Sequence, residues 1–164
     1  MNALEFLKSR RSTRSFSTKE VSRELILEIL ECAILAPTAR NIQPWHFVVI
    51  TKKETLNELA LLSDNGRFIA DSPTCIAVFC EETKYYLEDG CNATMNILTA
   101  AHILGLGACW VAGDKKDYTE SVKKLLSVPK NYNLVSLIPL GYFDEEPRLP
   151  SKKSLNDLAH WEKW

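Results

Sequence analysis

A dense group of cationic and hydroxyl side chains lies near the start of the chain, in the segment KSRRSTR. Its members are Lys8, Arg10, Arg11, Arg14, Ser9, Ser12 and Thr13. The arginine guanidinium group presents a fixed fork of donors that matches phosphate oxygens, and hydroxyl groups add neutral donors. The pattern favours a site for an anion such as a phosphate monoester. A solvated charged turn and a nucleic-acid patch are the alternatives.

The charge of the whole chain does not repeat this local excess. Lys and Arg number 20 against 21 Asp and Glu, for a net charge of −1. This balance argues against attachment to nucleic acid or to a membrane through an overall positive field. We therefore expect neither partner, and we interpret the basic segment as a local device.

The cysteines indicate the compartment. There are five, an odd number, and most lie within apolar stretches, as reduced thiols of an intracellular protein do. No apolar run approaches the length of about 20 residues that a membrane-spanning helix needs. We expect a cytoplasmic protein. No spaced cysteine and histidine ligand set is present, so we predict no metal site.

A second polar group lies in the loop APTARNIQPW, between Pro37 and Pro44. Its side chains are those of Thr38, Arg40, Asn41 and Gln43. The prolines stiffen both ends of the span, and the two amide groups offer donors and acceptors that suit the edge of a heterocycle. A purely structural turn beside proline is the alternative.

The segment GLGACW superficially resembles a dinucleotide-binding loop. It follows a predicted helix and opens a strand, whereas such a loop does the reverse, and its third glycine is missing. Gly105 is expected to end the helix, and Gly107 could let the backbone approach a flat ligand. Cys109 has no neighbouring His or Asp in the sequence to activate it. We assign no catalytic side chain.

Periodicity and capping signals predict the elements that position these groups. Helices are expected from the cap Asn2 to Lys8, from Ser22 to the residues before Pro37, from Thr51 to Leu62, from Leu87 to Leu104 and from Asp117 to Leu126, with a short one after Ser154. Four strands are expected over 45–51, 73–81, 107–112 and 133–143. The order predicts one α+β domain spanning residues 1–164. The narrow sheet and the long, small-residue helix favour a homodimer.

Four segments, taken in order, resemble the FMN-dependent nitroreductase family over essentially the whole chain. They are RRSTRSF, APTARNIQPWHF, GLGACWVAG and PLGYFDEEP, followed by the closing segment KKSLNDLAHWEKW. The resemblance, to a short, single-domain member, implies an α/β sandwich with a central, mainly antiparallel sheet flanked by helices. It also implies an intertwined homodimer, with one FMN at each of two interface sites.

The resemblance further implies which residues bind the cofactor. The phosphate and ribityl chain are assigned to Arg10, Ser12 and Arg14, with Arg11, Lys152, Lys153 and Arg148 as further phosphate candidates. The flavin ring is assigned to Thr38, Arg40, Asn41, Gln43, Gly107, Cys109 and Trp110. Asn65 and Arg67 are candidates on the substrate side.

The implied activity is electron transfer from NADH or NADPH through bound FMN to a nitroaromatic, a quinone or a similar small acceptor, by a ping-pong mechanism. The alternative is a flavin-binding protein without NAD(P)H turnover, for storage, sensing or delivery. The family also includes members that deiodinate, fragment flavin or desaturate. The resemblance therefore leaves the acceptor and the preferred nicotinamide open.

Overall fold

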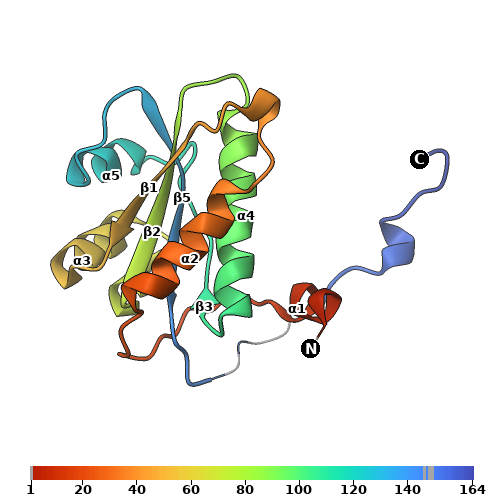
Figure 1. The fold of residues 1–164 in the computed structure, drawn as a ribbon, viewed down its shortest axis with the longest axis horizontal. Helices are drawn as coiled ribbons and strands as arrows, with labels where there is room; N and C mark the ends of the chain where they lie inside the picture. Colours follow the sequence, from red (N-terminus) through yellow and green to blue (C-terminus); the bar gives the residue numbers. More distant parts are fainter. Residues whose placement is uncertain (1, 146, 148–149) are drawn as a thin grey trace.

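The computed structural model describes residues 2–145, 147 and 150–164. A central antiparallel sheet is covered by helices on both faces (Figure 1). Its strands are β1 Trp45–Ile50, β2 Thr74–Glu81, β3 Gly107–Ala108, β4 Val111–Ala112 and β5 Tyr132–Gly141. The strand order is β1-β2-β5-β3, and β4 also pairs with β5. The predicted α+β class, with a mainly antiparallel sheet flanked by helices, is confirmed.

Four of the helices cover the sheet, and the first helix lies beside the body of the molecule. The long ones are α1 Ala3–Ser9, α2 Arg23–Ile34, α3 Lys53–Leu62, α4 Tyr86–Ile103 and α5 Thr119–Leu125. Short 3-10 turns occur at η1 Ala39–Asn41, η2 Arg67–Asp71 and η3 Leu155–Asp157. Helices α2 and α4 cover one face of the sheet, and α3 and α5 lie on the other (Figure 1). Among the described residues, no helix combines the length and apolar character needed to cross a membrane.

Strand β2 shows why helices pack on both faces of the sheet. Seven of its eight residues are buried. Because side chains alternate along a strand, Ile76 and Val78 join the core beneath α2 and α4. Cys75 and Phe79 face the core beneath α3 instead. The near-continuous apolar run in the sequence therefore corresponds to a strand that is buried on both sides.

The small residues of α4 let this helix lie close to the sheet. A Cβ atom at Gly90 would lie only 2.6 Å from Val135 of β5 and 2.9 Å from the Cys80 sulfur. Ala93 and Ala101 are fully buried on the same side. The tight packing that the sequence predicts thus serves helix and sheet contact within one chain.

The third predicted strand is divided in two. Gly107 and Ala108 pair with Gly141 and Leu140, and pairing resumes only where Val111 meets Leu137. Two residues of β5, Ile138 and Pro139, lie at the gap. The Pro139 carbonyl accepts from the Cys109 N–H at 3.2 Å, but proline has no N–H to donate. The sheet therefore has five strands, where the sequence analysis expected four.

Three predicted helix starts are confirmed, all at exposed positions. The Asn2 side chain accepts from the Glu5 N–H at 3.0 Å, and the Asn2 N–H donates to the Glu5 carboxylate at 2.7 Å. Ser22 accepts from the Leu25 N–H at 3.3 Å. Ser154 also caps its turn, although it accepts from the N–H of Asn156.

Two other predicted helix starts are wrong. Helix α3 follows Lys52 and helix α5 follows Tyr118, and neither has a side-chain cap. Both helices carry buried apolar residues, such as Leu59 and Val122. Since packing of a buried face stabilises a short helix more than a cap does, tertiary contacts select the first residue.

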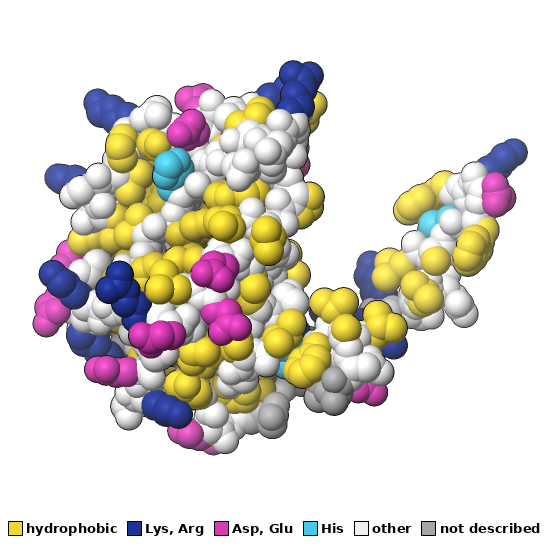
Figure 2. Space-filling model, viewed as in Figure 1, with side chains coloured by type: hydrophobic (Ala, Val, Ile, Leu, Met, Phe, Trp, Pro, Cys, Tyr) yellow, Lys and Arg dark blue, Asp and Glu magenta, His cyan; other side chains and the backbone are white. Residues whose placement is uncertain are grey.

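The C-terminal segment leaves the body of the molecule (Figures 1 and 2). Its large apolar side chains are strongly exposed, with Leu155 at 75%, Trp161 at 87% and Trp164 at 101%. Every residue from 151 to 164 is exposed. This segment offers apolar surface that the described part of its own chain does not cover.

Candidate functional site

The basic segment is held beside the short strand β3. Ser12 pairs in parallel with Ala108, and the Thr13 N–H donates to the Ala108 carbonyl at 3.0 Å. A Cβ atom at Gly107 would lie 2.6 Å from the Thr13 side chain. The missing side chain of Gly107 therefore lets the basic segment approach the sheet. The predicted contact of Gly107 with a flat ligand stays a prediction.

Arg11 supports the main chain of this segment. Its Nη1 atom donates to the carbonyls of Lys8 and Arg10, each at 2.7 Å, and so satisfies acceptors at the end of α1. Its Nε atom is buried, with no hydrogen-bond partner among the described residues. Arg11 thus combines a structural role with an unused donor.

The cations of the basic segment line a hollow of about 470 Å³. The lining residues are Leu7, Lys8, Arg10, Arg11, Ser12, Arg14, Pro150 and Lys152. Within the described ranges, no carboxylate forms an ion pair with any of these cations. We call this the basic hollow. Lys153 is not among its lining residues, and Arg148 lies outside the described residues.

A second hollow of about 440 Å³ adjoins the first through Arg14, which lines both. Its lining residues are Arg14, Asn65, Phe68, Cys109, Trp110, Val111, Ala112, Lys116 and Tyr118. We call this the aromatic hollow. The Arg14 guanidinium lies 5.8 Å from the centre of the Phe68 ring. The structure thus brings the substrate candidate Asn65 to the wall that holds Cys109 and Trp110, whereas Arg67 does not line the hollow.

Cys109 lies within the electrostatic influence of the basic segment. Burial raises the pKa of its thiol above the ordinary value. The Arg14 and Arg10 guanidinium groups and the Ser12 hydroxyl lower this pKa in part. The thiol is therefore neutral near pH 7, a form that is a poor nucleophile.

The loop between Pro37 and Pro44 is anchored by a buried carboxylate that the sequence analysis missed. Asp89, in the first turn of α4, is only 3% exposed. It accepts a hydrogen bond from the Thr38 hydroxyl at 2.8 Å and another from the Ala39 N–H at 3.0 Å. The Thr38 oxygen in turn accepts from the Gln43 N–H at 3.1 Å. The sequence could have indicated this anchor in one way, because Asp89 is an acidic residue on a helical face whose other residues are apolar or small.

Three residues of this loop have left-handed backbone conformations. The φ angle is 54° at Arg40, 57° at Asn41 and 54° at Gln43. Each such non-glycine residue costs about 1–3 kcal/mol and persists only where the surroundings enforce it. The bonds from Thr38 and Ala39 to Asp89, and from Gln43 to Thr38, hold the two ends of this strained stretch. Because such strain is concentrated at functional sites, the conformation supports a binding role for the loop.

The two groups of candidate residues lie at opposite ends of α4 (Figure 1). The loop is tied to Asp89 near the start of the helix, whereas Ser9, before the basic segment, contacts His102 Nε2 at 2.8 Å near its end. A helix rises 1.5 Å per residue, so these anchors are about 20 Å apart. Within one chain, the loop and the basic segment do not form one site.

Comparisons with known proteins agree with this geometry. Residues 7–67 and 65–142 match the model of the nitroreductase family. A protein of Methanothermobacter thermautotrophicus named "Putative NADH dehydrogenase/NAD(P)H nitroreductase" is 37% identical over 170 residues, which cover 100% of this chain and 88% of the relative.

Solved structures show the same similarity. An FMN-dependent nitroreductase from Clostridium difficile has a TM-score of 0.91 at 30% identity, covering 98% of this chain and 99% of its own. A protein from Desulfovibrio desulfuricans, described as "a putative nitroreductase in complex with fmn", has a TM-score of 0.88 at 27% identity, and the match covers 100% of this chain and 99% of that one. The fold is therefore one that holds FMN in at least one relative.

The anchoring role of Asp89 can be tested by replacing it with alanine. Asp89→Ala should lower the free energy of unfolding by about 3 kcal/mol, because hydrogen bonds to a charged group contribute about 1.5–3 kcal/mol each and two are lost. Urea unfolding followed by tryptophan fluorescence measures the change. Glu88→Ala, at the exposed neighbouring position, is the control. An equal loss in both variants would contradict the anchoring role.

Proposed function

This chain belongs to the nitroreductase family, and from that premise we propose that it is an FMN-dependent oxidoreductase, which takes electrons from NADH or NADPH and passes them to a small organic acceptor. The observation that carries the proposal is the pair of hollows that meet at Arg14. One is lined by cations that form no ion pair with a described carboxylate, and the other is walled by aromatic side chains. A ligand with a phosphate at one end and a flat ring at the other matches both.

The donors of the basic hollow suit the FMN phosphate. Arg10, Arg14 and Lys152 supply charge, and the Ser12 hydroxyl is a neutral donor. Arg11 adds a buried Nε–H without a partner among the described residues. A dianionic phosphate would satisfy these groups together. Lys153, next to Lys152 in the exposed segment, stays a candidate for the same role.

The aromatic hollow suits the flavin ring. Cys109 and Trp110 form one part of its wall and Phe68 another, so a flat ligand has apolar surfaces to pack against. Bound FMN supplies the capacity to accept two electrons from a nicotinamide and to pass them on. Arg14 places positive charge at the junction of the hollows, where it favours electron arrival. We propose that donor and acceptor use this hollow in turn, as a ping-pong mechanism requires.

A second copy of the chain would complete each site. The strained loop, with Thr38, Arg40, Asn41 and Gln43, is about 20 Å from the basic segment along α4, too far to contact the same FMN. In a homodimer, the loop of one protomer could meet the basic segment of its partner. We therefore propose two composite sites, each with one FMN at the interface.

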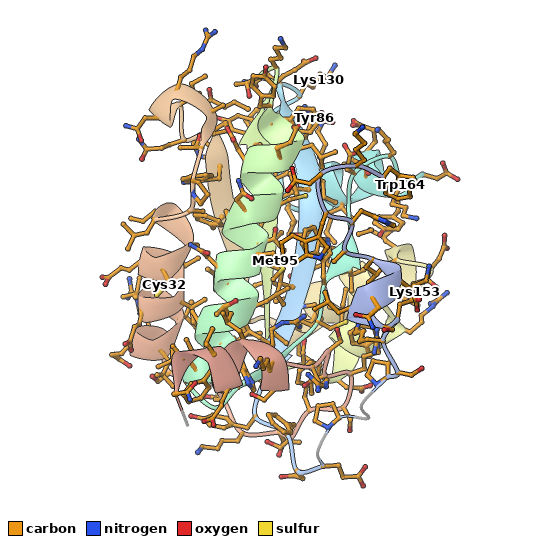
Figure 3. All side chains as sticks on the ribbon, turned by 90° about the vertical axis from the view of Figure 1, so that its right-hand side faces the viewer. Cys32, Tyr86, Met95, Lys130, Lys153 and Trp164 are labelled. Atoms are coloured by element: carbon orange, nitrogen blue, oxygen red, sulfur yellow. The ribbon has the colours of Figure 1, made fainter. Side chains whose placement is uncertain are left out.

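Exposed apolar side chains support this assembly. Met95, at the middle of α4, is 42% exposed, and Ile103 is 53% exposed. Figure 3 shows Met95 on a face of α4 that no helix of the described residues covers. The C-terminal segment adds Trp161 and Trp164. We propose that α4 packs near the two-fold axis and that the C-terminal segment wraps the partner.

All five cysteines are free thiols, consistent with the cytoplasmic location that we propose.

The visible spectrum of the purified protein tests the function. We expect a flavin spectrum that NADH or NADPH bleaches under anaerobic conditions and that a quinone or nitroaromatic restores. Bound flavin that neither nucleotide reduces would favour a flavin-binding protein without turnover. A protein that cannot be reconstituted with FMN would contradict the proposal.

Replacing Arg10 tests the phosphate site. Arg10→Ala should weaken FMN binding by about tenfold to a hundredfold, because a hydrogen bond to a charged group contributes about 1.5–3 kcal/mol. Fluorescence titration of the apoprotein with FMN measures the dissociation constant. Lys130→Ala is the matched control, since Lys130 is exposed at the end of the molecule far from the basic segment (Figure 3). Unchanged affinity in Arg10→Ala would remove this residue from the site.

Mixing two defective variants tests the composite sites. Arg10→Ala damages the basic segment, and Arg40→Glu places a negative charge in the exposed loop. In a mixed dimer, one site carries both defects and the other carries neither. Subunit exchange should therefore restore tight FMN binding to as many as half of the sites in mixed dimers. No recovery, with exchange verified by mass spectrometry, would show that each protomer holds FMN alone.

A further inference from the structure

The aromatic hollow carries charge of only one sign. Two of its lining residues, Arg14 and Lys116, are cationic, and its lining includes no carboxylate. Arg14 also borders the basic hollow, where the proposed phosphate would engage it. Lys116 borders the aromatic hollow alone. Of the two cations that line the aromatic hollow, Lys116 is therefore the one that the phosphate of bound FMN would not engage.

Lys116 differs in this respect from its neighbour. The Lys115 ammonium group lies 3.9 Å from the Asp114 carboxylate, is 82% exposed and does not line the hollow. Within the described ranges, Lys116 forms no ion pair. Its carbonyl accepts from the Thr119 N–H at 3.0 Å, which fixes its main chain before α5. The two adjacent lysines therefore have the same charge but different surroundings.

The walls around Lys116 are flat and firmly held. The Tyr118 hydroxyl donates to the Ala112 carbonyl, so this ring is fixed across the hollow. Phe68 and Trp110 add two further aromatic surfaces. Asn65 supplies amide donors and acceptors. Such walls favour a flat aromatic ligand.

The nearby acidic residues do not belong to the lining of the aromatic hollow, whose charged residues are all cationic. Asp64 and Asp117 are sequence neighbours of Asn65 and Lys116, but neither lines the hollow. Asp64 acts instead on Tyr118, whose pKa is raised by burial and further by this carboxylate. The charged side chains that line the hollow itself are therefore Arg14 and Lys116.

We propose that the acceptor is an aromatic anion, such as a nitrobenzoate or a sulfonated quinone, and that Lys116 selects it through its negative group. This inference rests on the proposed function and names the acceptor class for the same site. The balanced reaction for a nitro compound is ArNO2 + NAD(P)H + H⁺ → ArNO + NAD(P)⁺ + H2O. The nicotinamide is oxidised by two electrons, and one nitro oxygen leaves as water.

The test compares 4-nitrobenzoate with 4-nitrobenzamide, which differ in charge but little in shape. The measured quantity is the ratio of their kcat/KM values, with FMN-loaded protein and a single donor. Lys116→Glu should lower this ratio about tenfold and Lys116→Ala about threefold, the scale expected for an exposed charge. The matched control Lys115→Glu should change it by less than about twofold. Equal ratios in Lys116→Glu and the wild-type protein would overturn the proposal.

A binding measurement gives a readout apart from turnover. Benzoate, which cannot be reduced at a nitro group, should perturb the flavin absorbance of the oxidised protein and bind about tenfold more weakly to Lys116→Glu. Raising the salt concentration should weaken benzoate binding to the wild-type protein more than to Lys116→Ala. Benzoate affinity that is the same in the wild-type protein and in Lys116→Glu would exclude Lys116 from anion selection.

Two experimental outcomes distinguish an error in the acceptor class from an error in the proposed function. If either nicotinamide bleaches the flavin and 4-nitrobenzamide is reduced, but the ratio does not respond to Lys116, only the acceptor class is wrong. If neither nicotinamide bleaches the flavin in the wild-type protein, the proposed function itself is wrong, and this inference with it.

Discussion

The packing of α4 against the sheet is the constraint on which the rest of this molecule depends. Gly90 lets the helix lie against Val135 and Cys80, and Asp89 in the same turn holds the strained loop. Near the other end of the helix, His102 contacts Ser9, just before the basic segment. Helix α4 thus positions both groups of candidate residues, the loop at one end and the basic segment at the other. Because it also keeps them apart, the functional unit that we propose contains two chains.

The proposed site has two parts, one that supplies positive charge and one that supplies flat apolar walls. The basic segment concentrates positive charge in a chain that is nearly neutral overall, and its pairing with Ala108 fixes that charge beside the sheet. The adjoining aromatic hollow supplies flat apolar walls. Arg14 belongs to both. The flavin function that we propose would need few reactive side chains, because a bound flavin provides the chemistry and the protein provides binding, orientation and electrostatic field.

Several predictions from the sequence were accurate because they rested on local physics. The caps at Asn2 and Ser22 depend on residues three positions away, and the strands around Val78 and Leu137 depend on runs of apolar side chains. The caps proposed for α3 and α5 failed, since buried contacts outweigh a cap in a short helix. The break between β3 and β4 was missed because its cause, Pro139, belongs to another strand.

By itself, the sequence determined the α+β class, the family resemblance and the residue types of the site, because these follow from composition, periodicity and ordered motifs. Only the tertiary structure revealed Asp89 as the anchor of the loop, and only it placed Asn65, Cys109 and Lys116 around one hollow. It also separated the loop from the basic segment along α4. These facts depend on contacts between residues that are far apart in the chain, and no local pattern records which distant side chain will meet another.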